Sequence, residues 1–175
     1  EDGLPEGTIT NTLDFPLRDC ILAYGRWGYH LGKLQPGARA RIEPMSRQRV
    51  ELSTLLTATA FGDALEDGNW RNRGRPRPLD PSRDNIPDTL RTMMFFEALG
   101  GSRREGFSNR YQHFVDTSGL LKTGRAILVA TVPGGFALPQ RHGAVLLRDG
   151  QPMAKPEDRH TVMYRFVFPV KKKER

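Results

Sequence analysis

The sequence lacks the features that most directly identify a chemistry. Its 175 residues include a single cysteine, Cys20, so it forms no intramolecular disulfide and no cysteine-based zinc site. No apolar run approaches the length of about 18 residues that a membrane-spanning helix needs. Nucleophile-elbow, phosphate-loop and His-Glu-x-x-His patterns are also missing. The sequence therefore specifies no catalytic residue, no cofactor and no metal, and it favours a protein that is not an enzyme.

The cysteine and the histidines do not form a recognisable site either. Cys20 stands in an apolar run, where burial raises the pKa of a thiol and leaves it inert as a nucleophile. Metal sites usually contain a close pair of ligands, but the four histidines are far apart in the sequence. We expect His30 and His160 to lie on exposed faces of strands. The other two histidines are His113 and His142.

The composition is that of a folded, turn-rich and basic protein. Hydrophobic residues make up 37% of the chain and charged residues 27%, with 18 glycines and 13 prolines, which is typical of a globular protein. The length fits a single domain, residues 1–175. The formal charge of +7 favours anionic partners such as nucleic acid or lipid headgroups, although net charge alone indicates only non-specific binding.

The first 50 residues are typical of short strands joined by tight turns. Residues 17–24 place Cys20 and Leu22 on one face and Ile21 on the other, as in a strand covered on both sides. Gly25-Arg26 fits a type II′ hairpin turn, and Pro36-Gly37 fits a type II turn before a strand at residues 38–43. Trp27, Tyr29 and Tyr24 form either an aromatic binding platform or, as we favour, part of the core.

The end of the chain predicts further strands. Residues 126–132 and 143–147 are apolar runs of strand length. Residues 160–170 alternate, with Tyr164, Phe166 and Phe168 on one side and Arg165 among those on the other. This is the clearest strand pattern in the sequence.

The middle of the chain has a different pattern. Residues 86–99 have helical spacing and end at Gly100-Gly101, and a second short helix is expected at residues 108–115 with Tyr111, Phe114 and Val115 as its apolar stripe. Residues 50–65 fit a strand or a helix equally well. Residues 68–84 are rich in arginine, proline and glycine, which is typical of an exposed loop.

One segment of this loop has a specific precedent. Arg73-Gly74-Arg75-Pro76-Arg77 resembles the core of an AT-hook, an extended segment that lies in the minor groove of A/T-rich DNA. The resemblance implies a DNA-binding protein, cytoplasmic and without an export signal. The alternative is a solvated loop that only connects two elements.

The turn and strand pattern also carries a family resemblance. Ile9-Thr10-Asn11, Leu17-Arg18-Asp19 and Leu34-Gln35-Pro36-Gly37, together with residues 125–129 and 161–170, resemble the extracytoplasmic immunoglobulin-like β-sandwich regions of large bacterial membrane-anchored envelope proteins of unassigned function. The resemblance implies a location in the periplasm or cell envelope, tethered to the inner membrane. The chain begins at Glu1 and not at a methionine, and we expect any signal or anchor segment to precede it.

We therefore predict a mixed α+β fold that is mainly β: an antiparallel, immunoglobulin-like β-sandwich built from residues 7–50 and 120–170, with a helical and loop insertion at about residues 51–119. The predicted function is a non-catalytic extracytoplasmic interaction or scaffold module with a protein partner in the cell envelope. Insertions on a rigid scaffold commonly carry function. The candidate binding residues, all in the insertion, are Trp70, Arg71, Arg73, Arg75, Arg77, Arg103 and Arg104.

Overall fold

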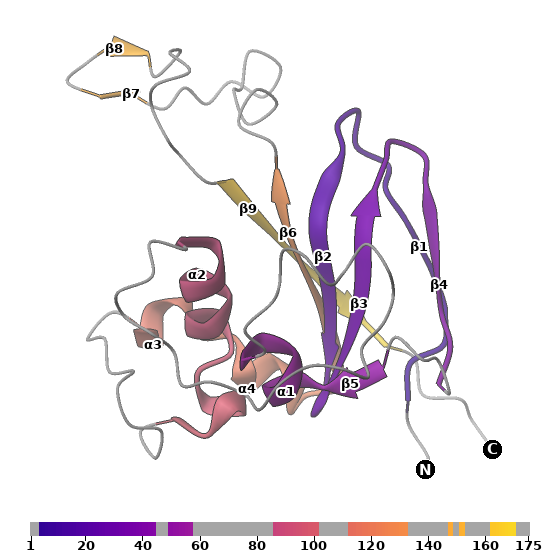
Figure 1. The fold of residues 1–175 in the computed structure, drawn as a ribbon. Helices are drawn as coiled ribbons and strands as arrows, with labels where there is room; N and C mark the ends of the chain where they lie inside the picture. Colours follow the sequence, from indigo (N-terminus) through magenta and orange to yellow (C-terminus); the bar gives the residue numbers. More distant parts are fainter. Residues whose placement is uncertain are drawn as a thin grey trace.

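A five-stranded antiparallel sheet forms the centre of the fold (Figure 1). The computed structural model describes residues 4–44, 49–57, 86–101, 112–132, 147–148, 151–152 and 162–170. Across the sheet the strands follow the order β5-β3-β2-β6-β9. Their bounds are β5 Arg49–Glu51, β3 Trp27–Leu34, β2 Leu17–Tyr24, β6 Arg125–Val132 and β9 Val162–Pro169. The sheet thus joins the two ends of the chain through β2 and β6, which pair antiparallel.

A two-stranded ribbon covers one face of this sheet. Strands β1 (Gly7–Thr10) and β4 (Arg39–Ile42) pair antiparallel, and Ile42 packs in one hydrophobic cluster with Leu22 and Leu128 of the sheet. Asn11 follows β1 and is buried; its side-chain amide donates hydrogen bonds to the carbonyl oxygens of Phe15 and Leu34, each at 3.0 Å. Because a buried amide is costly unless it is hydrogen-bonded, these contacts fix the ribbon to the sheet.

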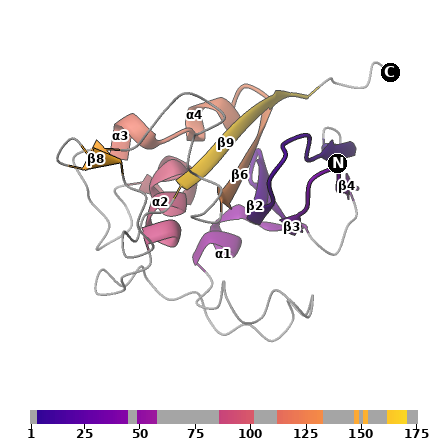
Figure 2. The same ribbon diagram turned by 90° about the horizontal axis from the view of Figure 1, so that it is seen from above.

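Helices cover the opposite face, and Figure 2 shows them on the other side of the sheet from β1 and β4. They are α1 Leu52–Thr57, α2 Ile86–Met94, η2 Glu97–Leu99, α3 Gln112–Val115 and α4 Ser118–Leu121. Leu55, Phe95 and Leu121 pack there against Ile21 and Ile127 of the sheet. Away from these layers, β7 (Leu147–Arg148) and β8 (Gln151–Pro152) pair with each other. No helix in the described part of the chain is long and apolar enough to cross a membrane.

Several local predictions are confirmed. Strand β2 is buried on both faces, with Cys20 and Leu22 in the cluster under the ribbon and Ile21 in the cluster under the helices. Gly25 has φ 56° in the β2–β3 hairpin, and Gly37 has φ 74° where the Ala38 amide closes its turn on the Gln35 carbonyl at 2.9 Å. Both positive φ values are ones that glycine adopts without steric cost. Strand β9 alternates as predicted.

Other local predictions are wrong or only partly right. His30 is buried, not on an exposed face, and Phe114 is 73% exposed instead of packing in an apolar stripe. The helix predicted for residues 86–99 ends at Met94 and resumes as the 3-10 turn η2. For the described part of residues 50–65, which is residues 50–57, both alternatives hold in part, since β5 extends the sheet to Glu51 and α1 begins at Leu52. Local periodicity gives no information on which distant residues cover a side chain, so the predicted exposure of these two side chains was wrong.

The fold class is therefore mixed α+β and mainly β, as predicted, with antiparallel sheets that do not close. The helices form a layer that shares a hydrophobic cluster with the sheet. Of the strand predicted at residues 143–147, only Leu147 is described, at the start of β7.

Candidate functional site

Strand β2 contains a bulge at Asp19, and it is the most unusual backbone feature of the described residues. Asp19 has φ 49°, and the pairing of β2 shifts register on both sides, between Cys20 and Ile21 toward β3 and between Arg18 and Ile21 toward β6. Aspartate tolerates the left-handed region better than most residues, but the conformation still costs energy. Bulges often lie beside functional sites because they re-aim a side chain.

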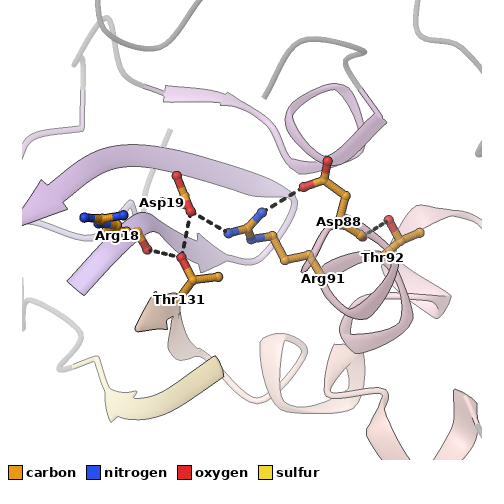
Figure 3. Close-up of polar contacts among 6 residues, drawn as sticks. All are labelled: Arg18, Asp19, Asp88, Arg91, Thr92 and Thr131. Atoms are coloured by element: carbon orange, nitrogen blue, oxygen red, sulfur yellow. Dashed lines mark hydrogen bonds and ion pairs between the residues drawn. The ribbon is translucent and has the colours of Figure 1, made fainter. Parts of the chain in front are cut away.

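A polar cluster holds the re-aimed Asp19 side chain (Figure 3). The Thr131 hydroxyl lies 2.7 Å from Asp19 Oδ2 and 3.2 Å from the Arg18 carbonyl oxygen. A hydroxyl has one proton, and the shorter contact to a charged acceptor is the stronger one, so Thr131 donates mainly to Asp19. The cluster thus connects β2 to the neighbouring strand β6.

Arg91 of α2 completes the cluster from the helical layer. Its guanidinium lies 3.4 Å from Asp19 Oδ2 and donates to Asp88 Oδ1 at 2.8 Å. The Arg91 side chain is only 3% exposed, whereas the carboxylates of Asp19 and Asp88 are 47% and 34% exposed. The Thr92 hydroxyl donates to the Asp88 carbonyl oxygen at 2.9 Å and adds a second tie within α2.

This arrangement stabilises the packing of α2 on the sheet; it does not resemble a reaction centre. A buried guanidinium is costly unless it is paired, and here two carboxylates from different elements pair with it. The neighbouring thiol offers no nucleophile: Cys20 points to the opposite face, and burial raises its pKa to about 12. No group of three or more potential metal ligands gathers within the described ranges.

A second polar feature lies at the hairpin end of β3. The guanidinium groups of Arg26 and Arg49 both lie over the Trp27 ring, at 4.8 and 4.5 Å from the ring centroid. Tyr29 is fully buried, and burial raises the pKa of its hydroxyl. The predicted preference for core packing is confirmed for Tyr29, and the partly buried Tyr24 and Trp27 pack against the same hydrophobic cluster. Trp27 also contacts the two cations.

The residues predicted as a binding surface are not among those that the structure describes. They are Trp70, Arg71, Arg73, Arg75, Arg77, Arg103 and Arg104, and the AT-hook-like segment lies outside the described residues with them. The same holds for His142 and His160. His113 is described and lies in α3, with its ring 3.9 Å from the ring of Phe114.

The polar cluster was missed by sequence reasoning, although a signal for it exists. Asp19 directly precedes the apolar run of β2, and Arg91 lies near Leu90, Met93 and Met94 in the segment with helical spacing. A charged residue at a position that the pattern assigns to the core is either paired or functional. Its partner could not be inferred, because Asp19 and Arg91 are 72 positions apart (91 minus 19) and only the fold brings them together.

The model of one protein family, described as a domain of unknown function (DUF8725), matches residues 1–113, which include the ribbon, β2, β3, α1 and α2. No curated protein and no solved structure matches the chain.

Proposed function

We propose that this chain, which belongs to the DUF8725 family of unknown function, is a non-catalytic interaction or scaffold module. In this proposal it works outside the cytoplasm, in the periplasm or cell envelope, as part of a bacterial membrane-anchored protein. Its partner is another envelope protein.

The observation that supports the proposal is that buried polar side chains connect the layers of the fold to one another. Asn11 ties the ribbon to the sheet, and Arg91 with Asp19 ties α2 to the sheet. Each of these groups contacts other parts of the same chain, as in a rigid scaffold. Catalytic groups are usually held instead in a cleft beside a proton donor or acceptor.

We also propose that the sheet and its ribbon form an immunoglobulin-like sandwich. Strands β1 and β4 pack face to face on the five-stranded sheet, and Phe15, Leu34 and Ile42 fill the space between the layers. This packing supports two β layers, although the second contains only two strands in the described residues. An experimental structure with a third or fourth strand beside β1 or β4 would support the sandwich; a layer of two strands would exclude it.

In this proposal the insertion carries recognition through Trp70, Arg71, Arg73, Arg75, Arg77, Arg103 and Arg104. A photo-crosslinking amino acid in place of Trp70 tests this in cells that produce the full-length protein. Arg41 is the control position, since its exposed side chain belongs to the ribbon. Crosslinking to one envelope protein from position 70 and not from position 41 supports the proposal. Equal crosslinking from both positions contradicts it.

Compartment is tested separately, by protease treatment of intact spheroplasts followed by detection of this domain. Digestion in intact spheroplasts is the expected result. Protection that is lost only on lysis would place the domain in the cytoplasm and contradict the proposal.

DNA binding is the alternative, and the Arg73-Gly74-Arg75-Pro76-Arg77 segment is the observation that favours it. Fluorescence anisotropy against A/T-rich and G/C-rich duplexes tests it, with an Arg73→Ala/Arg75→Ala double variant as control. A preference for A/T-rich DNA that persists at near-physiological salt and is lost in the variant would replace the envelope proposal. Weak binding that is equal for the two duplexes and disappears at near-physiological salt would indicate only non-specific attraction by the +7 charge.

A further inference from the structure

We propose that β9 is an open sheet edge that accepts an added strand from an acidic, extended segment of a protein partner. This inference rests on the proposed interaction function and gives that function a second surface, which is centred on β9 and does not use the seven candidate binding residues of the insertion. Strand β9 is last in the sheet order and pairs only with β6 among the described strands (Figure 1). It is eight residues long, whereas β5, the strand at the opposite edge, has three residues and leads directly into α1.

A long edge strand exposes a row of backbone amides and carbonyls that another strand can pair with. Soluble proteins usually protect such an edge by keeping it short, as in β5, or by placing charges and prolines along it. In β9 the charge is limited to Arg165, and the only proline, Pro169, ends the strand. None of its residues is fully buried, in contrast to the neighbouring strand β6. No described strand pairs with this edge, which leaves it available for strand addition, a common mode of peptide recognition.

One face of β9 presents a row of aromatic rings. Tyr164 and Phe166 stack with centroids 5.8 Å apart, and Phe166 and Phe168 follow at 6.5 Å. The Phe15 ring packs against Tyr164 at 5.7 Å and supports the row from the core side. The three rings of β9 remain partly exposed. Cross-strand contacts with aromatic or β-branched residues stabilise paired strands, so the row favours apolar residues at alternate positions of an incoming strand.

The other face of β9 is basic and apolar. Arg165 is exposed and donates to the Val115 carbonyl oxygen at 3.0 Å, at the end of α3. No carboxylate lies within ion-pair distance of Arg165 in the described part of the chain. Val167, the next residue on this face, is 37% exposed, and Phe114 of α3 is an exposed apolar residue on the helix that Arg165 contacts. An acidic side chain of the partner would meet in Arg165 an opposite charge that no carboxylate of the described residues pairs with.

The charge near β9 also distinguishes between two possible binding partners, a second copy of this chain and an acidic strand of another protein. Strands β6 and β9 contain no acidic residue, Arg125 pairs with Pro169 at the end of β9, and three lysines follow Val170 in the sequence. Two copies of β9 paired antiparallel would bring the Arg165 side chains of both copies close together, and like charges opposite each other destabilise a strand pair. The occupant we infer is therefore not a second copy but a strand that alternates apolar and acidic residues.

The test uses the full chain and a fluorescein-labelled peptide of eight residues, the length of β9, that alternates valine and glutamate. Two matched peptides serve as controls. One has lysine in place of glutamate, and the other keeps glutamate but is N-methylated at consecutive residues in its centre, which blocks strand pairing on both edges of the peptide. Fluorescence anisotropy at near-physiological salt should detect binding of the glutamate peptide and at least fivefold weaker binding of both controls.

Charge reversal in the protein locates the binding. Arg165→Glu should weaken binding of the glutamate peptide at least fivefold and should strengthen binding of the lysine peptide. Arg49→Glu is the matched control, because it makes the same change of net charge at β5, at the far edge of the same sheet. It should leave both affinities within about twofold. Circular dichroism of each variant establishes that the fold is retained.

The inference is overturned if the N-methylated peptide binds as tightly as the glutamate peptide, or if Arg165→Glu and Arg49→Glu change the affinity equally. It is also overturned if the glutamate peptide does not bind. A dimer of the free chain that Arg165→Ala stabilises would also overturn it, since a second copy would then occupy the edge. The proposed function survives these results if position 70 still crosslinks to one envelope protein. If that crosslink is absent while the glutamate peptide binds as expected, the insertion surface is wrong and the β9 surface stands.

Discussion

Removal of the Arg91 guanidinium should destabilise the protein, and the structure sets the size of the effect. The hydrogen bond from Arg91 to Asp88 is charge-assisted, and such bonds contribute about 1.5–3 kcal/mol when shielded from water. Asp88 and Asp19 are both partly exposed, so water recovers some of this energy. The contact to Asp19 is longer, at 3.4 Å, and a half-exposed pair is worth about 0.5–1 kcal/mol.

An opposing term has to be weighed. A buried guanidinium costs several kcal/mol of desolvation, and a well-packed apolar replacement sometimes offsets the loss of its pairs. Here the replacement would leave Asp19 and Asp88 facing each other with no cation between them. We therefore expect Arg91→Met, which keeps an unbranched apolar stem, to lower the free energy of unfolding by about 1–2 kcal/mol. Arg91→Ala also removes the buried stem and should cost about 2 kcal/mol more.

Urea denaturation followed by circular dichroism measures both variants, with Asp19→Asn as a third. Asparagine tolerates positive φ and still accepts the Thr131 hydrogen bond, so Asp19→Asn should cost no more than about 1 kcal/mol. The loss in Arg91→Met should shrink in about 1 M salt, because salt screens partly exposed charges. If Arg91→Met is as stable as the wild type or more stable, the cluster does not hold α2 on the sheet and the reasoning fails.

Three further predictions concern the core. Gly28→Ala should cost about 1–3 kcal/mol, because its Cβ would lie 2.5 Å from Leu55 Cδ2 in the fully buried contact between β3 and α1. Gly119→Ala is the control, because no atom lies within 4 Å of the added Cβ, and it should be neutral or slightly stabilising. Thermal melts of both variants measure the difference, and equal losses of stability would contradict the packing of α1 against β3. Iodoacetamide should alkylate Cys20 of the native chain at about pH 8 at least about 10³-fold more slowly than that of the unfolded chain, since its pKa rises from 9.0 to about 12 and only the thiolate reacts. That raised pKa means that the neutral thiol is favoured in the folded state, so its contribution to stability is complete below pH 9 and is lost as pH rises toward 12. Cys20→Ala should therefore lose less stability than the wild type between about pH 9 and 11, and equal slopes would refute the assignment.

Local rules predicted much of the β structure, because the residues that determine it are neighbours in the chain. Gly25 and Gly37 set two turns through their own φ angles, and the alternation of Tyr164, Phe166 and Phe168 identifies the faces of β9 without knowledge of its partner. The ambiguity at residues 50–65 was also genuine, since a strand and a helix meet between Glu51 and Leu52.

Predictions from the sequence were wrong or missing where the conformation or exposure of a residue depends on residues far away in the sequence. Phe114 has the spacing of a core residue in the helix predicted for residues 108–115, of which residues 112–115 are described, but its side chain is exposed. His30 is buried between layers that no local pattern reveals. The Asp19 side chain contacts partners on β6 and α2, and the place of β9 at the end of the described sheet depends on the order of all its strands. Helix α4 has only four residues, and the side chain of its N-cap residue Thr117 makes no capping hydrogen bond, so the sequence gives little signal for it.

Backbone amide hydrogen exchange, measured by NMR on the full chain with and without the valine–glutamate peptide, tests most directly whether β9 is an open edge. In the free chain, the amides of β9 that point away from β6 should exchange quickly, while those bonded to β6 are protected. Added peptide should protect the outward amides of residues 162–169 and leave β5 unchanged. Outward amides that are already protected in the free chain, or peptide-induced protection elsewhere in the sheet, would contradict the open edge.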